Sequence, residues 1–182
     1  MEALVDAAQR GEVPGEVVAV VADRVCDGIA IATDKGIPTV LLEPKSFASR
    51  DQWSEALRDE VARYEPDLVV SAGFMRILAP VFVDEFAGRL INLHPSLLPA
   101  FPGAHAVRDA LAAGVRVTGT TVHHVDHGVD TGRIIAQVSV DITPDDDETT
   151  LHERIKELER ELLPKVCSQM LKAAKGRNEG DG

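Results

Sequence analysis

The sequence predicts an α/β fold in which a mostly parallel β-sheet is covered by helices on both faces. The first observation is a set of short, continuously apolar runs, which are typical of strands buried on both sides. These runs are residues 17–21, 39–42, 68–71 and 90–93. The second observation is that segments with helical spacing separate the runs, as in β-α-β units with parallel strands.

The clearest helical segment covers residues 49–64. One stripe of this segment is apolar and the opposite face is charged, the pattern of a helix that packs with one side on a core. The apolar stripe consists of Trp53, Ala56, Leu57, Val61 and Tyr64. Ser49 is a suitable N-cap for this helix, and Pro66 marks its end.

The second half of the chain changes character. Residues 117–125 and 134–142 have the composition of two longer strands, and the Asp- and Gly-rich residues 126–133 connect them. Because no helix separates these strands, we expect them to pair antiparallel.

A final helix is expected from about Thr149, with N-caps offered by residues 145–147 and a capping box formed by Thr150 and Glu153. Pro164 is expected to kink or restart it. No linker or repeat interrupts the chain, so we expect one domain over residues 1–175. Residues 176–182 are polar and Gly-rich, which predicts a flexible tail.

Residues 2–10 have the pattern of a helix closed by Gly11, so the sequence opens with a helix. In a doubly wound sheet the first element is normally a strand, and the turn after it binds phosphate at a helix N-terminus. The first strand is therefore apparently missing. Either the sheet is one strand short or the sequence starts inside the domain.

The composition excludes several classes of function. A formal net charge of −11 argues against broad electrostatic capture of nucleic acid, although one basic pocket could still hold an anionic small molecule. No apolar run approaches the roughly 20 residues that span a membrane. Residues 1–6 carry neither a basic region nor an apolar run, so we expect no signal peptide. The only cysteines, Cys26 and Cys167, are far apart. We therefore expect a reduced, cytoplasmic protein without membrane association.

Residues 91–99 form the most specific segment. Asn92 and His94 are two residues apart on an expected strand, so their side chains share a face, and Pro95 then turns the chain out of the strand. In open α/β sheets, ligands bind at the carboxyl ends of the strands, where these two residues are expected. An amide and an imidazole at one point could polarise a carbonyl and exchange a proton. The alternative is a structural histidine beside a turn-forming asparagine.

A second segment, residues 126–132, places Asp130 between two glycines. Glycines allow a loop to approach closely, and an aspartate beside a histidine can orient the ring and favour its charged form. The alternative is an ordinary Asp-Gly connection between strands. Three histidines lie nearby, namely His123, His124 and His127. Their spacing is that of a strand and no further ligand completes a set, so we expect no metal.

A third segment, residues 71–78, follows an expected buried strand and combines Gly73 with Phe74, Met75 and Arg76. Such a loop could form an apolar slot for a flat heterocycle. The alternative is that its apolar side chains belong to the core.

Together these segments resemble the phosphoribosylglycinamide (GAR) formyltransferases, folate-dependent enzymes of purine biosynthesis. The resemblance covers residues 4–175 approximately. Its specific parts are AGFMRIL at 72–78, INLHPSLLPAFPGAHA at 91–106 and HVDHGVDTG at 124–132. It implies a Rossmann-like formyltransferase fold and transfer of a formyl group from 10-formyltetrahydrofolate to the amine of GAR.

The resemblance also implies roles for individual residues. Asn92 would orient the formyl oxygen, protonated His94 would stabilise the oxyanion and transfer a proton, and Asp130 would hold His94. The folate would contact Met75, Arg76, Ile77, Leu78 and Asn92. Arg50 would meet the glutamate end of the folate, and Gly103 and Glu159 would lie near the glycinamide of GAR. His123 matches a histidine close to the active site. No metal or redox cofactor is implied.

Two departures from the family pattern stand out. Arg133 occupies a position where the family commonly has proline. The strand and Gly-Ser-rich turn (GSGSN) that bind the GAR phosphate, normally found before the helix at residues 2–10, have no counterpart in this sequence.

Several alternatives stay open. Formyltetrahydrofolate deformylase and methionyl-tRNA formyltransferase share the Asn, His and Asp arrangement, but the tRNA enzyme should carry a further domain and a basic surface. A nucleotide-binding oxidoreductase would need a G-x-G-x-x-G turn, and this sequence has none. An inactive folate-binding remnant without the phosphate loop is the third alternative. The expected partners are small molecules, and the protein is expected to be a monomer or a homodimer.

Overall fold

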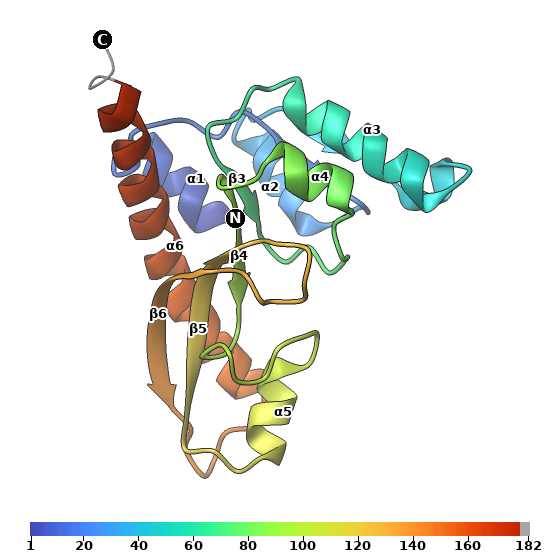
Figure 1. Cartoon of the computed structure of the whole chain (residues 1–182). Coiled ribbons are helices and arrows are strands. Elements are labelled where there is room, and N and C mark those ends of the chain that lie inside the picture. Colours follow the sequence, from blue (N-terminus) through green and yellow to red (C-terminus); the bar gives the residue numbers. More distant parts are fainter. Residues whose placement is uncertain (179–182) are drawn as a thin grey trace.

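The computed structural model describes residues 1–178, and its elements alternate along the chain as in an α/β protein (Figure 1). The strands are β1 (Val20–Ala22), β2 (Thr39–Leu41), β3 (Val69–Ser71), β4 (Leu90–His94), β5 (Val117–His124) and β6 (Ile134–Asp141). The α-helices are α1 (Glu2–Gln9), α2 (Asp27–Asp34), α3 (Arg50–Ala62), α4 (Pro80–Glu85), α5 (Ala106–Ala112) and α6 (Glu148–Asn178). A short 3₁₀ helix, η1, covers Pro44–Ser46.

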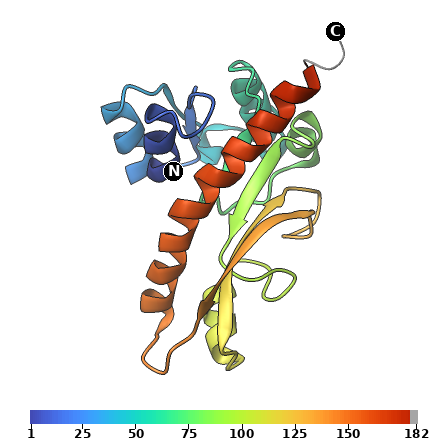
Figure 2. The same ribbon diagram turned by 90° about the vertical axis from the view of Figure 1, so that its left-hand side faces the viewer.

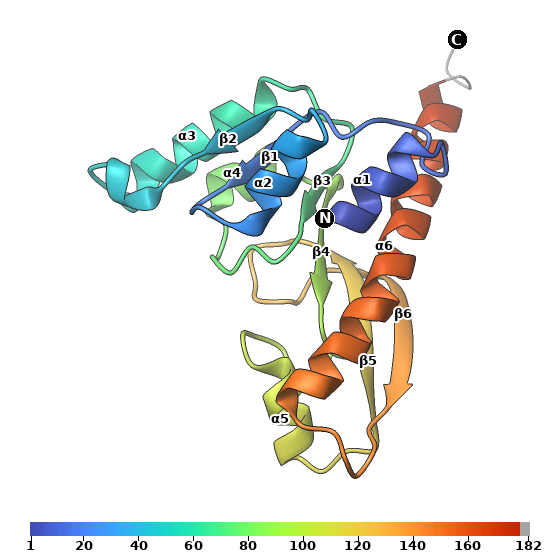
Figure 3. The ribbon, with the colours of Figure 1, turned by 180° about the vertical axis from the view of Figure 1, so that it is seen from behind.

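Strands β3, β4, β5 and β6 form one sheet in that order. Strands β3 and β4 are parallel, whereas β4–β5 and β5–β6 are antiparallel. The mixed α/β fold with antiparallel strands in the second half is thus confirmed. Strands β1 and β2 form a separate parallel pair beside α2 (Figure 3). The expected single sheet is divided in two because no strand of the described chain lies between β1 and β3.

Helices cover both faces of the four-stranded sheet, as expected. Helix α6 crosses one face, with α1 beside it (Figure 2). Neighbouring residues of β4 show this arrangement, because their side chains point to opposite faces. Ile91 packs in a core with residues of α1 and α6, and Leu90 packs in a core with residues of α3 and α4. Both side chains are fully buried, so β4 lies at the centre of the molecule.

The ends of two helices test the sequence-based expectations. Ser49 caps α3, since its hydroxyl accepts a hydrogen bond from the Gln52 amide, as expected. The expected capping box of Thr150 and Glu153 is wrong. Instead, the Thr150 amide donates to the Asp147 carboxylate at 2.8 Å and the Asp147 amide donates to the Thr150 hydroxyl at 2.8 Å. Glu153 accepts a hydrogen bond from Lys156.

Helix α6 continues through Pro164 to Asn178, so the expected restart does not occur. The residues around Pro164 explain this continuity, because Leu162, Leu163, Val166 and Cys167 are all buried in one core. The burial of these side chains stabilises the helix by more than it loses through the main-chain hydrogen bond that Pro164 cannot donate. Residues 176–178, expected in the tail, are helical, and residues 179–182 lie outside the described part of the chain.

Candidate active site

The site is built on the carboxyl end of β4. Asn92 and His94 share a face of this strand, and both line the same cavity. The antiparallel neighbour β5 sets His123 directly opposite Asn92 and Thr121 opposite His94. His94 is only 4% exposed and His123 only 2%. Such buried polar side chains need hydrogen-bond partners, and those partners define the site.

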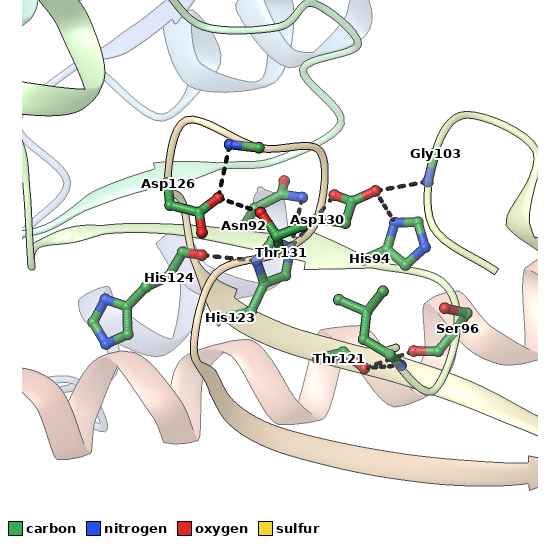
Figure 4. A network of polar contacts seen from close by, with 12 residues as sticks. Asn92, His94, Ser96, Gly103, Thr121, His123, His124, Asp126, Asp130 and Thr131 are labelled. Atoms are coloured by element: carbon green, nitrogen blue, oxygen red, sulfur yellow. Dashed lines mark hydrogen bonds and ion pairs between the residues drawn. The ribbon is translucent and has the colours of Figure 1, made fainter. Parts of the chain in front are cut away.

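Asp130 lies in the loop between β5 and β6 (Figure 4). Asp126 organises this loop, because its carboxylate accepts hydrogen bonds from the Thr131 hydroxyl at 2.7 Å and the Gly128 amide at 3.0 Å. The hydrogen bond from Thr131 is the main cause that lowers the pKa of Asp126. At Gly132 a β-carbon would collide with the main-chain carbonyl of His124, so the loop requires glycine there. Asp130 itself has a φ of 55°, a left-handed conformation that aspartate tolerates better than most residues.

His94 lies between two acceptors. Its Nε2 is 2.8 Å from the Phe101 carbonyl oxygen, and its Nδ1 is 3.3 Å from Asp130 Oδ2. The same carboxylate oxygen accepts a hydrogen bond from the Gly103 amide at 2.8 Å. Both ring nitrogens therefore face an acceptor, which provides partners for both N–H groups of a protonated ring. Gly103, expected near the glycinamide of GAR, also holds Asp130.

His123 contacts both Asn92 and Asp130. Its Nδ1 donates to the His124 carbonyl at 2.8 Å, and its Nε2 is 3.3 Å from Asn92 Nδ2 and 3.6 Å from Asp130 Oδ1. Asn92, His94, Asp130 and His123 thus form one connected polar cluster, with the Asp130 carboxylate between the two rings (Figure 4).

A second polar network supports the chain after β4, and the sequence reasoning missed it. The Thr121 hydroxyl donates to the Ser96 carbonyl at 2.7 Å and accepts from the Leu98 amide at 3.1 Å. The Gln137 side chain donates to the Leu98 carbonyl and the Thr121 hydroxyl, both at 2.9 Å. The available signal was the threonines at 118, 120 and 121 in the strand expected over residues 117–125. Buried hydroxyls need partners, and here they fix the turn that carries Phe101 and Gly103.

A cavity of about 740 Å³ opens beside this cluster. Nearly all of the site residues expected from the sequence line it, namely Met75, Arg76, Ile77, Leu78, Asn92, His94, Gly103, Asp130 and Glu159. Arg50 does not line the cavity. It is exposed at the start of α3, and its guanidinium donates a hydrogen bond to the Ile77 carbonyl at 2.7 Å. Arg50 therefore supports the outer side of the loop that forms one wall.

That wall, residues 72–78, is open and apolar. Met75 is 67% exposed and Ile77 is 60% exposed, so the alternative that the apolar side chains belong to the core is wrong for these two. It is confirmed for Phe74 and Leu78, which pack against the core that contains Trp53. Phe74 faces inward, with its ring stacked at 6.3 Å from that of Trp53. The Arg76 guanidinium forms an ion pair with Asp23 and lies over the Trp53 ring. The loop is anchored at its sides while its apolar tip faces solvent.

Helix α6 forms the opposite wall. Glu159 Oε1 lies 3.2 Å from the Thr120 hydroxyl, which is also 3.2 Å from the His94 carbonyl oxygen. Burial raises the pKa of the Glu159 carboxyl. His152, Lys156 and Arg160 line the same wall, and the sequence reasoning missed them. Their spacing of four residues was the available signal, because it places them on one face of a helix.

Arg133 contacts His124 and not Asp130. Its guanidinium donates to His124 Nε2 at 3.0 Å. Burial, with a further contribution from Arg133, lowers the pKa of His124. Within residues 1–178 no group of three or more His, Cys, Asp or Glu side chains is arranged to hold a metal ion. No helix in the described part of the chain is long and apolar enough to cross a membrane.

Comparisons with known proteins identify the family and agree with the fold. The family described as formyl transferase matches residues 1–167. A phosphoribosylglycinamide formyltransferase of Mycobacterium tuberculosis is 55% identical over 163 residues, which cover 90% of this chain and 75% of that protein. The crystal structure of phosphoribosylglycinamide formyltransferase from Bacillus halodurans superposes with a TM-score of 0.91 at 37% identity, covering 95% of this chain and 90% of that one. Glycinamide ribonucleotide transformylase 1 from Symbiobacterium toebii superposes with a TM-score of 0.90 at 38% identity, covering 92% and 79%. The chain belongs to the formyl transferase family.

Proposed function

We propose that this chain transfers the formyl group of 10-formyltetrahydrofolate to the amine of 5′-phosphoribosylglycinamide, in purine biosynthesis. Relatives named phosphoribosylglycinamide formyltransferase are 40–55% identical to this chain. The observation that carries the proposal is the group of an amide, a buried imidazole and a partly buried carboxylate at one cavity wall. Acyl transfer needs hydrogen-bond donors and positive charge where an oxyanion develops, and this group supplies both.

In the proposed reaction the lone pair of the GAR amine attacks the formyl carbon, and the carbonyl electron pair moves onto the formyl oxygen. Asn92 donates a hydrogen bond to that oxygen, and protonated His94, held by Asp130, stabilises its negative charge. Collapse of the tetrahedral intermediate re-forms the carbonyl and breaks the bond to the folate nitrogen. The amine loses one proton and the folate nitrogen gains one, with His94 as the relay. The transfer changes no oxidation state and so needs no redox cofactor.

The two walls of the cavity suit the two substrates. We assign the open apolar tip of residues 72–78 to the folate heterocycle, which would cover Met75 and Ile77. We assign Arg50, whose guanidinium binds the Ile77 carbonyl of this loop, to the carboxylates of the folate. We assign the α6 wall to GAR, with Glu159 near the glycinamide. Lys156 and Arg160 on this wall supply positive charge for an anionic substrate in a chain whose net charge is −11.

The test is an assay of the full chain with 10-formyltetrahydrofolate, with and without GAR. The proposal predicts formyl-GAR and tetrahydrofolate in equal amounts, and only slow release of formate without GAR. Rapid release of formate that is independent of GAR would identify a deformylase instead. Binding of a folate analogue without either product would identify an inactive folate-binding protein.

A further inference from the structure

The ring of His123 has one defined arrangement of hydrogen-bond donors and acceptors. Its Nδ1 lies 2.8 Å from the main-chain carbonyl oxygen of His124. A carbonyl oxygen can only accept, so Nδ1 carries the proton. In the neutral ring Nε2 is then an acceptor, and it lies 3.3 Å from Asn92 Nδ2. We propose that His123 is a positioning residue that fixes the orientation of the Asn92 amide, an inference that rests on the proposed formyl transfer.

The orientation of this amide determines what Asn92 presents to the substrate. The amide nitrogen has two hydrogens, and one of them is taken by His123 Nε2. The second remains for the formyl oxygen. If the amide turned over by 180°, Asn92 would present its own oxygen, an acceptor, to a developing oxyanion. The contact with His123 prevents this because a carboxamide oxygen facing a bare Nε2 would leave two acceptors opposed.

The carbonyl that orients His123 is itself fixed. The His124 amide donates to the Arg133 carbonyl at 2.9 Å, and the His124 ring accepts from the Arg133 guanidinium at 3.0 Å. Arg133 thereby holds His124 through its main chain and its side chain. This arrangement gives the residue that replaces the family's proline a supporting part in the site.

Asp130 is the group that competes for His123. Its Oδ1 lies 3.6 Å from His123 Nε2, beyond hydrogen-bond distance, whereas its Oδ2 faces His94 and accepts from Gly103. A proton on His123 Nε2 would turn this nitrogen into a donor for Asp130 and remove the acceptor for Asn92. The positioning role therefore requires the neutral ring with its proton on Nδ1.

The two amide replacements of histidine separate this role from a structural one. His123→Asn keeps a donor near the position of Nδ1 but has no atom near Nε2. His123→Gln can place an acceptor near Nε2. We expect His123→Asn to lower kcat about 10- to 100-fold with KM values changed less than about 3-fold, because an amide that is oriented correctly only part of the time loses part of the stabilisation that one oxyanion donor supplies. His123→Gln should recover most of this loss. The matched control is His127→Asn, at an exposed histidine whose ring contacts Asp84 outside the cavity lining, and it should change kcat by less than about 3-fold.

Two further measurements decide the proposal. In an Asn92→Ala background, adding His123→Asn should cause no further loss of kcat, because His123 acts through Asn92. Losses that multiply would overturn the proposal and identify an independent part for His123 in the reaction. Nitrogen NMR of the wild-type imidazole should show a protonated Nδ1 and an unprotonated Nε2 at pH 7. A proton on Nε2 would also overturn it. A wild-type protein with this ring state but no transfer to GAR would instead contradict the proposed function.

Discussion

The two ends of the cavity differ in how completely they are organised without substrate. At the β4 end, Asn92, His94 and Asp130 are held by partners from β5 and from two loops. At the other end, residues 72–78 are anchored at their sides but expose Met75 and Ile77. The difference indicates a division of labour. Under the proposed function, we expect the buried end to govern kcat, because its polar groups are already held in place. We expect the open end to govern KM, because a bound folate would cover its exposed apolar side chains.

The largest expected effect is at the buried end. His94→Ala removes the group that faces both Asp130 and the Phe101 carbonyl. We expect kcat to fall by about 10²- to 10⁴-fold, the range for a positioned acid–base group. The fold should survive, because Asp130 keeps the hydrogen bond from Gly103. Steady-state kinetics and a thermal melt check both points. A folded variant with full activity, or a variant that is unfolded, counts against this assignment.

The second effect should appear at the open end. Ile77→Ala removes apolar surface that a bound folate would cover, at a cost of about 1–2 kcal/mol. The KM for 10-formyltetrahydrofolate should rise roughly 5- to 30-fold, while kcat changes less than about 2-fold. Val25→Ala, at another exposed apolar position outside the cavity lining, is the matched control. A fall in kcat without a change in KM would break the proposed division.

A smaller effect is expected at the support of the same wall. Arg50→Ala removes the hydrogen bond to the Ile77 carbonyl and a positive charge at the outer side of the loop. One such hydrogen bond contributes about 0.5–1.5 kcal/mol, so the KM for the folate should rise about 2- to 10-fold. Folates with longer glutamate chains sharpen the test. If Arg50 binds the carboxylates of these chains, Arg50→Ala should raise the KM more for folates with glutamate than for a folate without it.

The smallest effect concerns stability. Burial raises the pKa of Glu159. Protonated Glu159 contributes to the free energy of unfolding. This contribution is complete below the pKa of the carboxyl in the unfolded chain, and it is lost as the pH rises through the raised pKa of the folded protein. Glu159→Gln does not titrate, so its Tm relative to the wild type should increase between about pH 4 and pH 7. We expect about a few degrees at most. A Tm difference that is constant over this range would show that the carboxyl is not perturbed.

Local sequence patterns predicted much of this fold. Four apolar runs and two longer strand-like segments correspond to the six strands of residues 1–178, and the Ser49 cap follows from local chemistry alone. The period of two residues along a strand likewise placed Asn92 and His94 on one face. These features depend on residues that are close in sequence, which is why they could be inferred without a structure.

The remainder depends on contacts between distant segments. The register that sets His123 opposite Asn92 joins residues 31 positions apart, and no local pattern reveals it. For the same reason, the sequence did not reveal that Thr121 and Gln137 support the turn after β4, or that Arg50 contacts Ile77. At Pro164 a local rule failed, because burial of the surrounding turns keeps α6 continuous.

The central claim is that the Asp130 carboxylate holds His94 for formyl transfer, and Asp130→Asn tests it most directly. Asparagine tolerates the φ of 55° at this position, and its amide oxygen can still accept from Gly103. The negative charge beside His94 is lost, and an NH2 group replaces the Oδ1 atom that faces His123 at 3.6 Å. The measurement is the single-turnover rate of formyl-GAR formation at saturating substrates, with Asp84→Asn, an exposed carboxylate of α4, as the control. We predict a loss of at least about 100-fold for Asp130→Asn and less than about 2-fold for the control. A folded Asp130→Asn variant with the wild-type rate would contradict the account.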